Sequence, residues 1–271
     1  MDYLGIVEEI LSDGLSKTSD TFRLLQLAWL RSMQNADGGF SGRQGPSDLY
    51  YTDFAVRCIV LLDRNSGILD HAKVYLSNWR RDPVDYVELF NLLNLSRMLH
   101  PPGGLQETAC WRPPVISAPN AYDVFLHSLC REMRGDDIPL INGIIDADHS
   151  EQSSLLAASV GKRIVEKTIT EQEANQIAIQ LAAFQSADGG FLAHKDAVGS
   201  ELLSAFNVVL SLSFLGKMSL VNVPLLARYV RGCACASGGF GASPDDPERD
   251  IEYTYYGLGL LGLLMNLSLG E

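Results

Sequence analysis

The sequence predicts an all-α protein in which five or six helical hairpins close into a ring, a single domain over residues 1–271. Three observations support this fold class. A glycine-rich turn recurs along the chain, an amphipathic helix is predicted before it, and a helix without charged residues is predicted after it. A helix with one apolar face suits the outside of such a ring, and a helix that is apolar all round suits the inside.

The repeated turn sets the number of units. Gln-Asn-Ala-Asp-Gly-Gly-Phe at 34–40 recurs as Gln-Ser-Ala-Asp-Gly-Gly-Phe at 185–191, and Ala-Ser-Gly-Gly-Phe follows at 236–240. The last two copies are 49 residues apart (238 − 189), and the first two are 151 apart (189 − 38), or about three periods. Weaker copies at 102–105 and 142–145 fit this spacing. Units of this length fill the chain, as in other repeat architectures.

The helix before each turn is predicted to be amphipathic, and residues 170–185 are the clearest case. Thr170 and Glu173 form a capping-box pattern at the helix start. The apolar residues that follow at helical spacing are Ala174, Ile177, Leu181 and Phe184. The Asp-Gly-Gly turn ends this helix, because glycine adopts the left-handed conformation that a helix C-terminus requires.

The helix after each turn is predicted to be buried. Residues 202–216 and 254–269 contain no charged side chain. An open array of hairpins would need a polar helix at its end, whereas the last helix here is the most apolar, so a closed ring is favoured. Alternation of apolar and polar residues is nowhere sustained, which argues against a sheet.

Composition and charge exclude several classes. The chain carries 21 basic and 33 acidic residues, a net charge of −12, which argues against nucleic-acid binding and against docking on an anionic membrane. Residues 1–15 lack the pattern of a signal peptide, and the longest uncharged stretch, 254–270, is short for a membrane span. The five scattered cysteines predict a reducing, cytoplasmic location rather than a disulfide framework.

The turn and the residues that follow it resemble a known family. Gly38 to Arg43 is followed by Asp-Leu-Tyr-Tyr-Thr at 48–52, and the turn at 238–240 is followed by Asp-Ile-Glu-Tyr-Thr-Tyr-Tyr at 250–256. This pattern resembles the repeat of prenyltransferase β-subunits and squalene cyclases. The resemblance implies an α/α toroid with a central cavity for an isoprenoid chain, and for a transferase it implies a helical α-subunit as partner.

The zinc site of protein prenyltransferases is not matched. In that family an Asp-x-Cys pair and a histidine hold a zinc ion that activates a thiol. Ser200-Glu201-Leu202 stands where the pair would fall, and Tyr253 stands where the histidine would fall. Asp250 is the remaining candidate metal ligand, and Mg²⁺ is an alternative to zinc. Cys233 and Cys235 are interpreted as two small residues at a helix end.

The resemblance gives two candidate diphosphate contacts, Arg43 and His194, which follow equivalent turns. Arg43 matches an arginine that contacts diphosphate in the family; the alternative is a surface arginine paired with Asp48 or Asp53. His194 occupies the same place in its own unit; the alternative is a loop histidine without a role.

Three acidic residues are predicted to open inner helices: Asp48, Glu201 and Asp250. They either cap these helices or, if they converge, hold a metal or polarise an acceptor. Aromatic residues cluster beside them: Tyr50, Tyr51, Tyr253, Tyr255 and Tyr256. They either pack in the core or line the cavity, where aromatic faces grip an isoprenoid and stabilise a carbocation.

A separate motif, Asp-Ala-Asp-His at 146–149, resembles the Asp-x-Asp-Asp motif of class II terpene cyclases. Asp148 would then be the acid that protonates an alkene or an epoxide. The alternative is that these residues cap a helix that begins near Ser150.

These observations give three hypotheses. The leading one is binding of a prenyl diphosphate and transfer of its prenyl group. The second is a non-catalytic toroid that binds an apolar ligand or a protein, and the third is a cyclase that uses Asp148. Many of the acids fall in or after the turns, so they are predicted to surround one end of the cavity. An acidic mouth without a cation repels diphosphate. Three alternatives follow: a cation such as Mg²⁺ binds at the mouth, the ligand is not a diphosphate, or the mouth binds a basic partner protein.

Overall fold

The computed structural model describes residues 2–100, 111–115, 119–135, 138, 150–246 and 248–267. In these residues the chain is mainly helical, with two small two-stranded sheets. The helices are α1 (Tyr3–Ser16), α2 (Asp20–Met33), α3 (Leu49–Leu62), α4 (Ile68–Ser77), α5 (Tyr86–Leu99), α6 (Ala121–Arg134), α7 (Ser153–Val165), α8 (Glu171–Ala182), α9 (Leu202–Phe214), a 3₁₀ turn (Met218–Leu220), α10 (Val223–Cys233) and α11 (Ile251–Leu267). The strands are β1 (Phe191–Leu192), β2 (Ser200–Glu201), β3 (Phe240–Gly241) and β4 (Arg249–Asp250).

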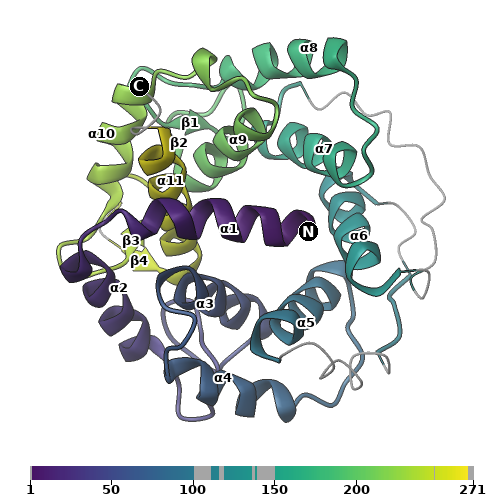
Figure 1. The fold of residues 1–271 in the computed structure, drawn as a ribbon, viewed down its shortest axis with the longest axis vertical. Helices are drawn as coiled ribbons and strands as arrows, with labels where there is room; N and C mark the ends of the chain where they lie inside the picture. The colour runs from purple at the N-terminus through teal and green to yellow at the C-terminus, as the bar shows by residue number, and fades with distance from the viewer. Residues whose placement is uncertain are drawn as a thin grey trace.

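In the described part of the chain, six helices form a closed ring, and the course of this ring can be followed in Figure 1. Following the ring, α3 packs on α5, then come α6, α7, α9 and α11, and α11 returns to α3. The helices α2, α4, α8 and α10 lie outside this ring, each against an inner helix. The predicted all-α toroid is therefore confirmed, and its closure depends on the contact between the first and last units.

The predicted difference between outer and inner helices is also found. In the outer helix α8, Thr170 and Glu173 form the predicted capping box, and Ala174 and Leu181 are buried. In the inner helices α9 and α11, buried residues lie on every side. The inner face of the ring is therefore covered by apolar side chains that local sequence periodicity already marks as buried.

The glycine-rich turns connect outer helices to inner helices, and the backbone pairing is the same in each turn. Gly38 and Gly189 have φ values of 90° and 97°, and a Cβ on Gly38 would lie 2.1 Å from the carbonyl oxygen of His71. The phenylalanine after each turn is fully buried and pairs, antiparallel, with the acidic residue before the inner helix. These pairs are Phe40 with Asp48, Phe191 with Glu201 and Phe240 with Asp250. Each turn thus fixes one carboxylate at the start of an inner helix.

The N-terminal helix α1 crosses the ring (Figure 1) and packs most extensively on α11. It contacts the last turns of four ring helices. The amide nitrogen of Tyr3 donates to Glu132 of α6, and the Tyr3 ring stacks on Phe214 of α9 with centroids 5.1 Å apart. Asn266 of α11 donates to the carbonyl of Ile10, and Glu8 pairs with Arg97 of α5. Helix α1 therefore covers the end of the ring at which these four ring helices have their C-termini.

No helix in the described part of the chain is long and apolar enough to cross a bilayer.

Candidate functional site

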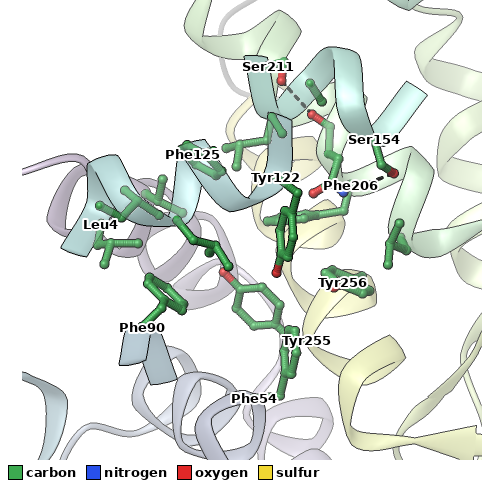
Figure 2. Close-up of a pocket in the computed structure, with 18 of the residues that line it drawn as sticks. Leu4, Phe54, Phe90, Tyr122, Phe125, Ser154, Phe206, Ser211, Tyr255 and Tyr256 are labelled. Carbon is green, nitrogen blue, oxygen red and sulfur yellow. Dashed lines mark hydrogen bonds between the residues drawn. The ribbon is translucent and has the colours of Figure 1, made fainter. Parts of the chain in front are cut away.

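A cavity of about 430 Å³ lies at the centre of the ring. Side chains from α1 and from all six ring helices line it, and most of the lining is apolar. Nine of the described lining residues are aromatic: Tyr3, Tyr50, Phe54, Phe90, Tyr122, Phe125, Phe206, Tyr255 and Tyr256. Figure 2 shows Phe90, Tyr122 and Phe206 facing this space from three different helices.

The cavity runs along the axis of the ring. At one end it is lined by residues from the first turns of inner helices, such as Tyr50, Tyr122 and Leu203, and Tyr122 is 41% exposed. We call this end the mouth. At the other end Leu4 and Val7 of α1 line the cavity. The mouth thus lies where the repeated turns place their carboxylates, and the opposite end is closed by α1.

One charged side chain, Arg57 of α3, is found among the described lining residues. Its guanidinium lies over three rings, with centroid distances of 4.9 Å to Phe54, 5.0 Å to Phe90 and 5.3 Å to Tyr255. It forms an ion pair with Asp53, whose side chain is 0% exposed. Burial raises the pKa of Asp53, and the charge of Arg57 opposes this rise. The guanidinium of Arg57 therefore has a carboxyl partner within the wall of the cavity.

A second polar cluster stands at the mouth, in the first turn of α11. Oε1 of Glu252 accepts a hydrogen bond of 2.7 Å from the Tyr50 hydroxyl and one of 3.1 Å from the Tyr256 hydroxyl. Burial raises the pKa of Glu252, the two hydroxyls lower it, and the charges of Asp250 and Glu201 raise it further. The two tyrosines line the cavity, so they connect its apolar wall to this carboxylate.

Two of the three predicted carboxylates at the helix starts, Asp48 and Asp250, cap their helices, and Glu201 makes no such bond to the backbone. Asp48 accepts from the amide of Tyr51 at 2.8 Å, and Asp250 accepts from the amide of Tyr253 at 3.0 Å. Burial raises the pKa of both groups, and these backbone bonds partly offset the rise. Glu201 instead accepts from the hydroxyl of Ser204 at 2.8 Å. Asp48 and Asp250 line the same open hollow at the mouth, so the ring does bring two of the three together.

The two predicted diphosphate contacts are placed differently. Arg43 lines the hollow at the mouth, but it pairs with Glu248 and lies 3.8 Å from Asp246. The alternative of a surface ion pair is thus seen, though with acids of the last unit rather than with Asp48 or Asp53. His194 is exposed in the loop after β1, where its backbone bridges to Gln152, and it does not line the cavity.

The predicted tyrosines divide between the cavity and its surroundings. Tyr50 and Tyr255 line the cavity. Tyr51 lines the hollow at the mouth instead. Tyr253 lies among acids: burial raises its pKa to about 12, and the charges of Glu201, Glu252, Asp250 and Asp246 add to this rise.

The candidate metal ligands and the cyclase motif have different outcomes. Among the residues that the structure describes, no group of three or more His, Cys, Asp or Glu side chains is placed to hold a metal ion. Cys233 is buried at the end of α10, and both it and Cys235 are free thiols. The proposed acid Asp148 lies outside the described residues, as do the weaker turn copies at 102–105 and 142–145.

Two site residues, Glu252 and Arg57, were not expected from the sequence. Arg57 had a usable signal, since Asp53 and Arg57 are the only charges in an otherwise apolar inner helix and stand four residues apart. Glu252 had a weaker sequence signal: it lies two residues after Asp250, which was predicted to cap the helix. Its role depends on Tyr50, which is 202 residues away in the sequence.

Comparison with protein families matches the greater part of the chain. The model of the "Prenyltransferase alpha-alpha toroid domain" matches residues 8–82 and 140–269. The matched ranges contain four of the six ring helices in full, α3, α7, α9 and α11, while α5 and α6 lie in the unmatched stretch between them. A search of curated proteins found no match.

Proposed function

The chain belongs to the prenyltransferase α/α-toroid family, and on that basis we propose that it binds an isoprenoid whose hydrocarbon chain occupies the central cavity. The observation that carries this proposal is the aromatic cavity at the centre of the ring. Its volume, about 430 Å³, is in the usual range of small-molecule sites, roughly 300–1,000 Å³.

The shape of the cavity supports a ligand with an apolar tail and a polar head. Burial of hydrocarbon against aromatic side chains is the dominant favourable term for such a tail. Since α1 closes one end, the tail would enter from the mouth, and the head would remain beside the polar groups there. Arg57 does not oppose this, because its guanidinium is paired with the carboxyl group of Asp53.

Prenyl transfer by the zinc route of the family is less well supported than binding. That route needs a thiolate ligand and a histidine, and this chain has Leu202 and Tyr253 at those positions. If transfer occurs, the activating groups would be the carboxylates Asp48, Glu201 and Asp250, with a divalent cation such as Mg²⁺. The substitutions favour a second candidate function, a toroid that binds an isoprenoid without zinc-dependent chemistry.

A cavity-filling variant tests the binding proposal. Ala158 is buried and lines the cavity, so Ala158→Phe places a ring in the space for the tail. Equilibrium binding of radiolabelled farnesyl and geranylgeranyl compounds should be stoichiometric for the unmodified protein. It should weaken by about tenfold or more in the variant. Ala183→Phe, at an exposed site after the outer helix α8, is the matched control and should bind normally.

A photoreactive prenyl analogue gives a second readout that does not depend on the variant folding. It should label peptides of α6 and α9, which line the cavity. Failure of all these compounds to bind, or labelling confined to the outer helices α2, α4, α8 and α10, would refute the proposal.

A further inference from the structure

We propose that the mouth selects an isoprenoid whose head group is an uncharged or cationic hydrogen-bond donor, an alcohol or a protonated amine, over one that carries a diphosphate. The inference rests on the proposed function, because it requires that an isoprenoid tail fills the cavity. It adds the chemical class of the head group.

The first support is the way in which Glu252 is held. Both Tyr50 and Tyr256 donate to the same oxygen, Oε1, so Oε2 receives no hydrogen bond from the residues that the structure describes. A carboxylate oxygen accepts strongly from an ammonium or a hydroxyl group. Glu252 lies behind Tyr50 and Tyr256, which line the cavity, so a donor head between these tyrosines would meet a carboxylate that they already hold in place.

The second support is the sign of the charges around that oxygen. The charges of Asp250 and Glu201 both act on Glu252, and both raise its pKa. Tyr253, on the same turn of α11, is influenced by these three acids and by Asp246. An anion at this point would be repelled by several carboxylates in a partly buried site, where solvent screens charges less than in bulk water.

The third support is the state of the cations. Among the described residues that line the cavity and the hollow at its mouth, the cationic side chains are Arg57 and Arg43. Arg57 is paired with the fully buried Asp53. Arg43 is paired with Glu248 and lies near Asp246. A diphosphate would have to displace a carboxylate from one of them, whereas an amine or an alcohol needs neither.

The aromatic wall near the mouth fits the same head groups. Tyr50, Tyr122 and Tyr256 lie at the level of Glu252, and each of the three tyrosine hydroxyls is influenced by its charge. Aromatic faces attract an ammonium group, and tyrosine hydroxyls can also exchange hydrogen bonds with an alcohol.

The test compares head groups on one tail. Farnesol, farnesylamine and farnesyl diphosphate are titrated against the full chain by calorimetry, the diphosphate both with and without Mg²⁺. We expect the amine and the alcohol to bind at least about tenfold more tightly than the diphosphate under both conditions. Tighter binding of the diphosphate, in either condition, would overturn the inference. Failure of all three to bind would instead count against the proposed function itself.

Two variants assign the selectivity to the named groups. Glu252→Gln should weaken farnesylamine binding by about tenfold and should not weaken diphosphate binding. Glu171→Gln, which makes the same charge change on the outer helix α8, should leave all three affinities unchanged. Glu248→Gln removes the partner of Arg43 and should strengthen diphosphate binding. Equal affinities for the three compounds that do not respond to Glu252→Gln would contradict head-group selection while leaving tail binding intact.

Discussion

Gly14 of α1 and Gly262 of α11 lie in backbone contact where the two helices cross. A Cβ on Gly14 would come within 1.9 Å of the carbonyl oxygen of Gly262, and a Cβ on Gly262 would come within 2.7 Å of the carbonyl oxygen of Leu11. The two helices can therefore approach this closely only with glycine at both positions. This contact holds α1 across the end of the ring, where Leu4 and Val7 of this helix line the central cavity.

Replacing Gly14 by alanine should therefore destabilise the protein. The added methyl group overpacks a contact between two backbones, which typically costs about 1–3 kcal/mol. The higher helix propensity of alanine, roughly 1 kcal/mol, offsets only part of this. Urea denaturation should show a net loss in the free energy of unfolding. Gly67→Ala, at the exposed N-cap of α4, is the control, since a Cβ there meets nothing within 4 Å, and it should cost no more than about 0.5 kcal/mol. Equal stabilities of the two variants would show that α1 is not seated as described.

Two of the three clear copies of the turn are held by a buried threonine, the fourth residue of the inner helix that follows. The hydroxyl of Thr52 accepts from the amide of Phe40 at 2.9 Å, and Thr254 accepts from the amide of Phe240 at 3.0 Å. Thr52→Val keeps the shape but leaves a buried N–H group without a partner, at a cost of about 1–3 kcal/mol. Thermal or urea unfolding measures this loss. Thr168→Val, at an exposed site, should change stability by less than about 0.5 kcal/mol. A neutral Thr52→Val would mean that water or another group satisfies the amide.

The ring could be predicted from the sequence because its signals are local and repeated. The glycines of each turn, the capping box at Thr170 and the charge-free stretches of α9 and α11 each determine the conformation or burial of a short segment. Their repetition then implies that the segments pack in the same way. The order of the ring follows from the order of the units, since neighbouring units in the chain are neighbours in space.

The contacts at the mouth could not be predicted, since they cross the seam where the ring closes. Tyr50 bonds to Glu252 across 202 residues of sequence, and Arg43 pairs with Glu248 across 205. Both contacts join the first unit to the last. The position of α1 could not be predicted for the same reason. The sequence of an amphipathic helix shows that one of its faces is buried, but it does not show which helix that face packs on. Periodicity indicates burial, whereas a pairing between distant residues requires the closed structure.

The ion pair between Asp53 and Arg57 predicts that substitutions of the two residues have strongly coupled effects on the free energy of unfolding. Asp53 is fully buried, and besides Arg57 it is contacted by the side-chain amide of Asn94 at 2.8 Å. Arg57→Met should lower the free energy of unfolding by about 3–5 kcal/mol, because it leaves a buried carboxylate without its cation. The double variant with Asp53→Leu should lose much less than the sum of the two single variants. Lys73→Met, which breaks the exposed pair with Asp70, should be nearly neutral. Additive losses at Asp53 and Arg57 would show that the two residues are not coupled.

The carboxylate at the mouth predicts a pH dependence whose sign follows from its environment. Burial raises the pKa of Glu252 above its ordinary value of 4.5, so the folded state holds this proton more tightly than the unfolded state does. Between 4.5 and the raised value, its contribution to stability therefore falls as the pH rises. The free energy of unfolding of the unmodified protein minus that of Glu252→Gln should decrease across this window, by about 1.4 kcal/mol per pH unit, and level off above it. Urea denaturation at a series of pH values measures the difference. Tyr50→Phe removes a hydroxyl that lowers this pKa, so it should extend the window upward. A difference that stays constant with pH would show that the folded protein does not shield Glu252 from solvent.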